Sequence, residues 1–171
     1  MKLRTFTNAI VMLGLLLLCG SFSQTASAQT ADWDYVRVRS PLTEVVVTTK
    51  SGSYTATFQN DATVYPTGRA DGLLSFQPDG GKTIRYNVVA GRVLMTEGQV
   101  TEVRLLMRRV GSDPGDELDI AVVRPAPVSS EECLIYDIFG ADVSAVSDGL
   151  RQGERPSAQF DAHGWIEVIR F

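Results

Sequence analysis

Hydrophobic and polar residues alternate in short runs over most of the chain after residue 31. Two such runs, Glu44–Lys50 and Ser53–Gln59, are separated by Ser51-Gly52. Alternation with a period of two indicates a strand with one buried face, and a small Ser-Gly connection between two strands favours a hairpin turn. One face of the second run carries Tyr54, Ala56 and Phe58.

Further runs of the same kind follow. Leu73–Gln77 and Thr83–Ala90 flank the turn sequence Pro78-Asp79-Gly80-Gly81, and Leu118–Val123 forms another β-type run. Short strands at this regular spacing are typical of a β-sandwich or a β-barrel. The pattern therefore predicts an all-β protein.

One segment departs from the alternation. Within residues 101–110, four apolar side chains follow the helical spacing i, i+3, i+4 and i+7, and Gly111 stands where a helix C-cap is expected. They are Val103, Leu106, Met107 and Val110. This favours one short helix over residues 101–110, while the alternative, a strand, places Leu106 on the polar face.

The N-terminus has the features of an export signal. Lys2 and Arg4 precede the apolar run Ala9–Gly20, and Ala26-Ser27-Ala28 offers the small residues that a signal peptidase accepts. We expect residues 1–28 to be a signal peptide cleaved near Ala28, and the mature protein to be periplasmic, secreted or at the cell surface. Cleavage removes two basic residues and makes the net charge of −4 more negative.

The composition of the chain limits the classes of binding partner that we expect. The chain has 16 Lys and Arg residues against 20 Asp and Glu residues, so it lacks the basic excess of a nucleic-acid-binding protein. The mature part holds no second apolar run near the length of a transmembrane helix. We therefore expect neither a nucleic-acid partner nor a transmembrane segment in the mature chain, and proteins of the cell envelope or of a secretion machinery as partners.

The last third carries a series of short motifs. They are Tyr136-Asp137, Ile138-Phe139-Gly140, Asp148-Gly149, Phe160-Asp161 and Gly164-Trp165. In this order they resemble the immunoglobulin-like C-terminal domains that act as sorting signals for type IX secretion, and the related immunoglobulin-like module of the flagellar hook-capping protein. This chain lacks the final strand of such domains.

The resemblance implies an immunoglobulin-like β-sandwich. With the pattern above it predicts a signal peptide at 1–28, an additional N-terminal β module at 29–112 and an immunoglobulin-like sandwich half at 113–171. An edge is left open where the final strand is missing, and we expect Trp33–Arg39 to cover it.

Few residues suggest chemistry. Cys133 is the only cysteine left after cleavage and His163 is the only histidine, so they are the candidates for a nucleophile and its base. Arg104, Arg108 and Arg109 form a local basic group that a binding partner with carboxylate or sulfate groups would fit. An acidic group that offers oxygen ligands for Ca²⁺ contains Asp113, Asp116, Glu117 and Asp119. A turn around Pro114-Gly115 also explains it, so we expect no bound metal or cofactor.

These observations predict an exported binding or assembly protein of the cell envelope without catalytic activity. Two alternatives remain open. One is a type IX secretion cargo with a shortened sorting domain, and the other is a thiol hydrolase or transferase that uses Cys133 and His163.

Overall fold

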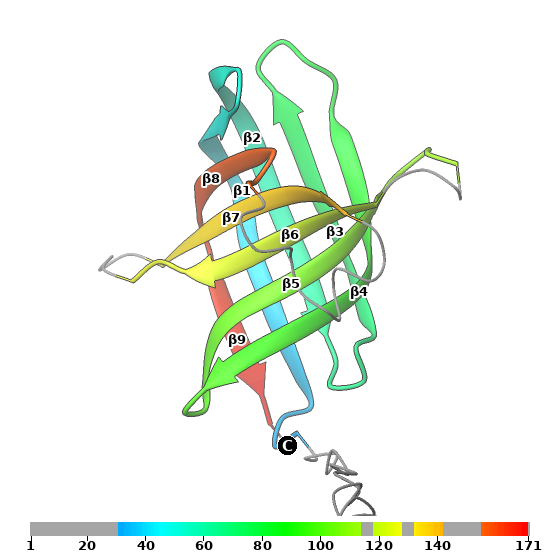
Figure 1. Ribbon diagram of the computed structural model, residues 1–171, viewed down its shortest axis with the longest axis vertical. Helices are drawn as coiled ribbons and strands as arrows, with labels where there is room; N and C mark the ends of the chain where they lie inside the picture. The colour runs from blue at the N-terminus through cyan, green and yellow to red at the C-terminus, as the bar shows by residue number, and fades with distance from the viewer. Residues whose placement is uncertain (1–30, 114–117, 128–131, 142–154, 171) are drawn as a thin grey trace, which may run out of the picture. The chain divides into compact units, whose positions relative to one another are not determined.

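The protein is described by a computed structural model in which residues 31–113, 118–127, 132–141 and 155–170 are placed well enough to describe. These residues form nine antiparallel strands (Figure 1). Their bounds are β1 Tyr35–Thr49, β2 Gly52–Val64, β3 Ala70–Pro78, β4 Ile84–Thr96, β5 Gln99–Arg109, β6 Leu118–Pro125, β7 Cys133–Ala141, β8 Ala158–His163 and β9 Trp165–Ile169.

The strands close into a barrel. Strands β1 to β8 pair consecutively, each with the next in the chain, and β1 pairs on its other side with both β8 and β9. Because β8 and β9 follow one another along the same side of β1, the strands close into a wall with eight strand positions. The expected immunoglobulin-like sandwich is therefore wrong, although the expectation of an all-β chain is correct.

Closure depends on the N-terminal strand. Tyr35 to Arg39 of β1 pair with Ile169 to Trp165 of β9, as expected for a run that covers an open edge, but the result is a closed barrel. Residues 31–171 form one compact unit, and β5 and β6, which lie on either side of residue 112, pair directly in the same wall.

A β-bulge in β1 changes which side chains of this long strand face the interior of the barrel. Ser40 pairs with Asn60 and Thr43 with Phe58, so Pro41 and Leu42 face a single residue of β2. Before the bulge the even-numbered side chains are buried, and after it the odd-numbered ones are. The proline that we would expect to end a strand is accommodated in this bulge, where an unpaired residue is tolerated.

Residues 101–109 belong to strand β5 and Val110 to the turn that follows, so the short helix that their spacing favoured is wrong. Val103, Leu105 and Met107 of β5 point into the barrel, and Leu106 points outward. Leu106 is nevertheless buried, and it packs against other buried apolar side chains outside the barrel interior. It belongs to a cluster on β5, β6 and β7 formed by Leu106, Leu118, Ile120, Val122 and Phe139. Apolar residues on both faces of the strand produced the false helical pattern.

Gly164 separates β8 from β9 and has no room for a side chain. A Cβ atom there would lie 2.4 Å from both the Arg39 carbonyl oxygen and the Ser40 hydroxyl. Its amide donates a hydrogen bond to the Glu132 carbonyl. This close approach lets the chain change from pairing with β7 and the end of β1 to pairing with the start of β1.

The interior of the barrel is filled by alternating inward side chains, as in other eight-stranded barrels. Phe58, Tyr136 and Phe160 are the largest of them near the middle, and valines of β1, β2 and β5 pack around them. Tyr136 and Phe160, which belong to the motifs of the last third, lie inside the barrel. Trp165 lies on the outer wall, where the Arg39 guanidinium is 5.7 Å from its ring. Within the described ranges, the chain forms no long apolar helix of the kind that spans a membrane.

Candidate functional site

A cavity of about 200 Å³ lies at one end of the barrel. This is the end that carries the β1–β2 and β3–β4 turns, drawn uppermost in Figure 1, and we call the space the upper cavity. Its wall is contributed by β1 to β8, because each of these strands places one or more inward side chains there. A closed barrel thus gathers residues that are far apart in sequence around one space.

Aromatic rings dominate the lining. Tyr54 on β2, Phe76 on β3, Tyr86 on β4 and Phe160 on β8 all face the upper cavity. The Phe76 ring lies 6.1 Å from both the Tyr54 ring and the Phe160 ring, centroid to centroid. Tyr54 is 40% exposed, so the cavity reaches solvent at its rim. Aliphatic side chains and Met107 complete a mostly apolar surface, which suits an apolar ligand.

Asp119 is the charged residue of the lining. It is half-buried on β6 and pairs across the sheet with Met107 and Gly140. Burial raises the pKa of the Tyr86 hydroxyl above its ordinary value, and the negative charge of Asp119 and a hydrogen bond to it raise that pKa further. The nearby Arg109 opposes this shift. Tyr86 is therefore a neutral donor toward Asp119 at physiological pH.

The floor of the upper cavity is a tight aromatic layer. The Phe58 ring lies 4.7 Å from the rings of both Tyr136 and Phe160, in edge-to-face contacts. Tyr136 and Phe160 are stacked at 5.2 Å. These distances are shorter than those at the rim, so this layer separates the cavity from the rest of the interior.

Beneath this layer the Tyr136 hydroxyl joins a buried polar network. It lies 2.9 Å from the Ser40 hydroxyl, and the Asn60 amide nitrogen donates to it at 3.1 Å. Burial raises the pKa of Tyr136 to about 12, against the opposing effect of these hydrogen bonds. The Asn60 amide oxygen is buried without a hydrogen-bond partner. The network fixes the β1, β2 and β7 strands relative to one another.

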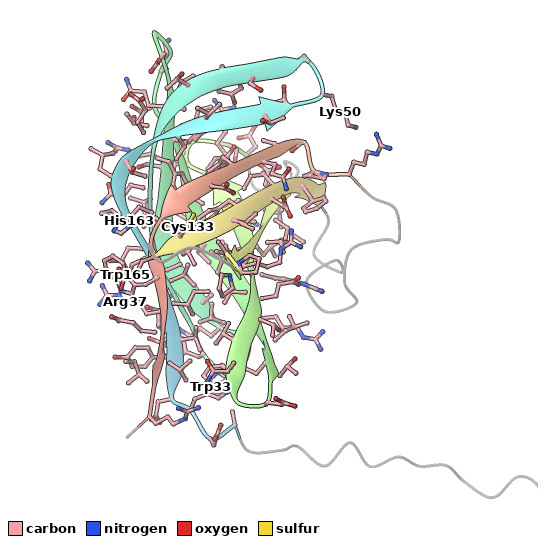
Figure 2. The ribbon with its side chains drawn as sticks, turned by 90° about the vertical axis from the view of Figure 1, so that its left-hand side faces the viewer. Trp33, Arg37, Lys50, Cys133, His163 and Trp165 are labelled. Atoms are coloured by element: carbon pink, nitrogen blue, oxygen red, sulfur yellow. The ribbon has the colours of Figure 1, made fainter. Side chains whose placement is uncertain are left out.

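Cys133 and His163 are brought together. They are directly opposite in the pairing of β7 with β8, and both point outward (Figure 2). His163 is exposed, and its ring lies 6.2 Å from the Trp165 ring. A thiol beside an imidazole is the minimum arrangement for a nucleophile and its base. Neither residue lines the upper cavity.

The three arginines do not form one surface. Arg104 and Arg108 take outward positions on β5, whereas Arg109 takes an inward position opposite Tyr86. Arg104 also forms an ion pair with Glu102, with 2.6 Å between the guanidinium and a carboxylate oxygen. Only Arg109 is thus placed near the upper cavity, where its charge acts on Tyr86.

The acidic group is divided as well. Asp119 lines the upper cavity, Asp113 is exposed after β5, and Asp116 and Glu117 lie outside the described residues. In the described part of the chain, no group of three or more histidine, cysteine and acidic side chains is arranged to hold a metal ion.

Sequence reasoning missed the upper cavity. The alternation correctly placed Tyr54, Ala56 and Phe58 on one face of β2, but it does not show that the ends of different strands meet. The available signal was that Tyr54, Phe76 and Tyr86 all lie close to predicted turns. Asp119 was singled out as a calcium ligand and not as the charge of an aromatic cavity.

Comparisons of the chain with known protein families, with curated proteins and with solved structures gave no match.

Proposed function

We propose that the protein is an exported binding protein of the cell envelope that holds a small, largely apolar molecule in the upper cavity. The observation that carries this proposal is a cavity of about 200 Å³ with four aromatic rings and one charged residue in its lining. Ligand sites are commonly apolar cavities with a few polar groups, and the mouths of β-barrels are frequent places for them. An eight-stranded barrel has room for side chains or for one small ligand.

The size of the cavity limits the ligand. A dry cavity of about 150 Å³ in a protein core can hold a benzene molecule. The upper cavity therefore suits a single ring with a short substituent, and larger lipids would have to extend past the rim at Tyr54.

The binding proposal is tested by titrating the protein with 2-phenylethanol and following methyl resonances by NMR. We expect shifts at Ile84, Met107 and Ile138, which line the upper cavity, and none at Ile166 of β9. Ala158→Leu fills part of the cavity and should weaken binding, whereas Ala31→Leu at an exposed position should not. Equal shifts at both ends of the barrel, or binding unaffected by Ala158→Leu, would contradict the proposal.

Export is the second part of the proposal, and it is supported by the sequence of residues 1–28. Fractionation of the producing cell with mass spectrometry of the intact protein tests it. We expect a form outside the cytoplasm that begins near Gln29. A cytoplasmic protein that keeps Met1–Ala28 would count against export and leave the binding proposal intact.

A thiol hydrolase or transferase is a second candidate, favoured by one observation, the direct opposition of Cys133 and His163. It is tested by incubation with an activated thioester and detection of an acyl group on Cys133 by mass spectrometry. We expect labelling to be lost in Cys133→Ser and slowed in His163→Ala. Labelling at the same rate in His163→Ala would remove this candidate. The type IX secretion alternative stays a prediction based on the motifs of the last third.

A further inference from the structure

β9 is an edge strand of the barrel wall. It pairs with Tyr35–Arg39 of β1 on one side, and no described strand pairs with its other side. β9 contains neither proline nor lysine, and its register with β1 has no bulge, so it lacks common features that block an incoming strand. We propose that this free edge of β9 binds an extended segment of a partner protein as an additional antiparallel strand. The segment carries a basic side chain between two apolar ones, and its site is separate from the upper cavity, to which β9 contributes no residue.

The backbone groups at the free edge are those of Ile166 and Val168. In an antiparallel strand the hydrogen-bonding groups of successive residues point to opposite edges. The Gly164 amide donates away from β1, to the Glu132 carbonyl just before β7, whereas the Ile169 carbonyl accepts from the residue before β1. Both bonds direct the odd-numbered residues of β9 to β1 and the even-numbered ones to the free edge. A row of amides and carbonyls at strand spacing is matched by another extended polypeptide, which identifies the kind of partner.

The inward side chains of β9 are less covered than those of β1. Val36 and Val38 are 0% exposed, yet Val168 and Ile166, which lie directly opposite them, are only half-buried. Both pack against the barrel core. A strand added beside β9 would cover them with its own inward side chains, because residues on the same face of neighbouring strands contact one another. The partner segment therefore has apolar residues at alternate positions.

Glu167 lies between these two residues of β9, on the outer face, and is exposed. Its carboxylate accepts a hydrogen bond from the Trp165 indole at 3.0 Å and has capacity for further donors. On the β1 side, the sequence that pairs with this part of β9 is Val36-Arg37-Val38, with Arg37 directly opposite Glu167. Opposite charges across two strands are favourable. The same apolar, basic, apolar pattern therefore suits the free edge.

A second copy of this chain fits the edge less well. When the whole of β9 pairs antiparallel with β9 of a second copy, the two Glu167 side chains lie directly opposite each other. Like charges in this position are destabilising. The charge of the edge thus favours a different protein with a basic residue at the central position.

Capped synthetic peptides test the pairing in NMR titrations of the full protein. The probe is Ser-Thr-Val-Arg-Val-Thr-Ser, with its valines opposite Ile166 and Val168, so that the valine amides point to β9. N-methylation of both valine amides should abolish binding, whereas N-methylation of the arginine amide, which points away, should change the affinity by less than about threefold. Equal binding of the two methylated peptides, or loss only after methylation of the arginine, would overturn the inference. No binding of the unmethylated peptide would also overturn it and leave the proposal for the upper cavity standing.

Amide hydrogen exchange locates the site on the unmodified protein. In the free protein we expect the Ile166 and Val168 amides to exchange quickly and the Glu167 amide, which points to β1, to be protected. Saturating peptide should slow exchange at Ile166 and Val168 by at least about tenfold and leave Ile84 of the upper cavity unchanged. Protection of Ile166 and Val168 in the free protein would overturn the inference, and a rise of that protection with protein concentration would assign the edge to a second copy.

A change of charge tests the basic residue of the segment. The peptide with glutamate in place of arginine should bind at least about threefold more weakly to the unmodified protein. Glu167→Gln should bring the two peptides to within about twofold of each other. Glu44→Gln is the matched control, since Glu44 is exposed on β1 beyond the residues that pair with β9. Equal binding of the two peptides by the unmodified protein, or a preference for arginine that survives in Glu167→Gln, would overturn the inference.

Discussion

The middle and the upper end of the barrel are built from the same strands but are filled differently. In the middle, the rings of Phe58, Tyr136 and Phe160 are 4.7–5.2 Å apart and are almost fully buried. At the upper end, the Phe76 ring lies 6.1 Å from the Tyr54 ring and 6.1 Å from the Phe160 ring, and these residues line a cavity of about 200 Å³. Close packing in one layer supplies stability, and looser packing in the next leaves room for a ligand. The difference shows that a barrel interior can divide these two tasks between adjacent layers.

The largest loss of stability is expected from deletion of Leu42. This deletion would change which β1 side chains face inward, and both layers depend on them. The bulge at Pro41 and Leu42 reverses which side chains of β1 face inward. Without the extra residue, either Val36 and Val38 or Val45 and Val47 must turn outward. We expect the deletion variant to lose its cooperative unfolding transition. Urea denaturation monitored by circular dichroism measures this loss.

Leu42→Thr is the matched control, because Leu42 is 68% exposed and its side chain contributes little to the core. This substitution should leave the unfolding transition nearly unchanged. A deletion variant that unfolds like Leu42→Thr would show that the bulge is not required.

The second prediction compares the two layers directly. Phe58→Ala in the middle should lower the free energy of unfolding by about 3–5 kcal/mol, the usual cost of truncating a fully buried phenylalanine. Phe76→Ala should cost clearly less, since Phe76 is only half-buried beside an existing cavity. Urea denaturation measures both, and equal losses would contradict the proposed division between the layers.

The third prediction concerns the polar network beneath the middle layer. Tyr136→Phe leaves Ser40 and Asn60 buried without the hydroxyl that they share, at a cost of about 1–3 kcal/mol at neutral pH. The change is checked by urea denaturation of both proteins at pH 7. A loss close to zero would show that the network is not needed.

Tyr136 also makes the stability of the folded protein depend on pH. Tyr136 ionises near pH 10 in the unfolded chain, whereas its pKa in the barrel is about 12. The unfolded chain therefore loses this proton first, and stability falls between pH 10 and 12 by up to about 3 kcal/mol. Thermal unfolding should show this fall in the unmodified protein and a smaller one in Tyr136→Phe.

The smallest change in stability is expected from a substitution on the outer wall of the barrel, away from both layers. Asp61 of β2 accepts two hydrogen bonds from the Arg37 guanidinium of β1, which lower the pKa of Asp61. A lowered pKa contributes stability above the ordinary value of 3.8 that disappears as the pH falls through the folded value. Asp61→Asn should slightly lower the melting temperature at pH 7, and the difference should vanish in acid. Asp79→Asn, at an exposed position of the β3–β4 turn, serves as a control for loss of one charge.

The sequence was sufficient for the local elements and insufficient for their closure. Alternation and turn residues predicted the β1–β2 and β3–β4 hairpins and the inward face of β2, because these depend on neighbours in the chain. Whether such strands make a sandwich or a barrel depends on the pairing of Tyr35–Arg39 with Trp165–Ile169, and no local pattern reports that pairing. The motifs of the last third favoured the sandwich and were misleading.

The candidate site was predictable only in part, for the same reason. Asp119, Cys133 and His163 were singled out by residue type, but their neighbours depend on which strands are adjacent. The opposition of Cys133 and His163 follows from the register of β7 with β8, and the position of Asp119 among aromatic rings follows from closure. The helical spacing in β5 failed because Leu106 faces an apolar outer wall, which sequence alone does not reveal.

The joining of β1 to β9 also constrains how the protein folds. Strands β1 to β8 pair consecutively along the chain, whereas the pairs of β1 with β8 and with β9 link the two ends of the described chain. Contacts between distant residues slow folding, because a long loop must close before they form. Until β9 has been synthesised, β1 keeps an unpaired edge on which other chains can add strands. The protein is therefore most vulnerable to aggregation just before its last strand is in place.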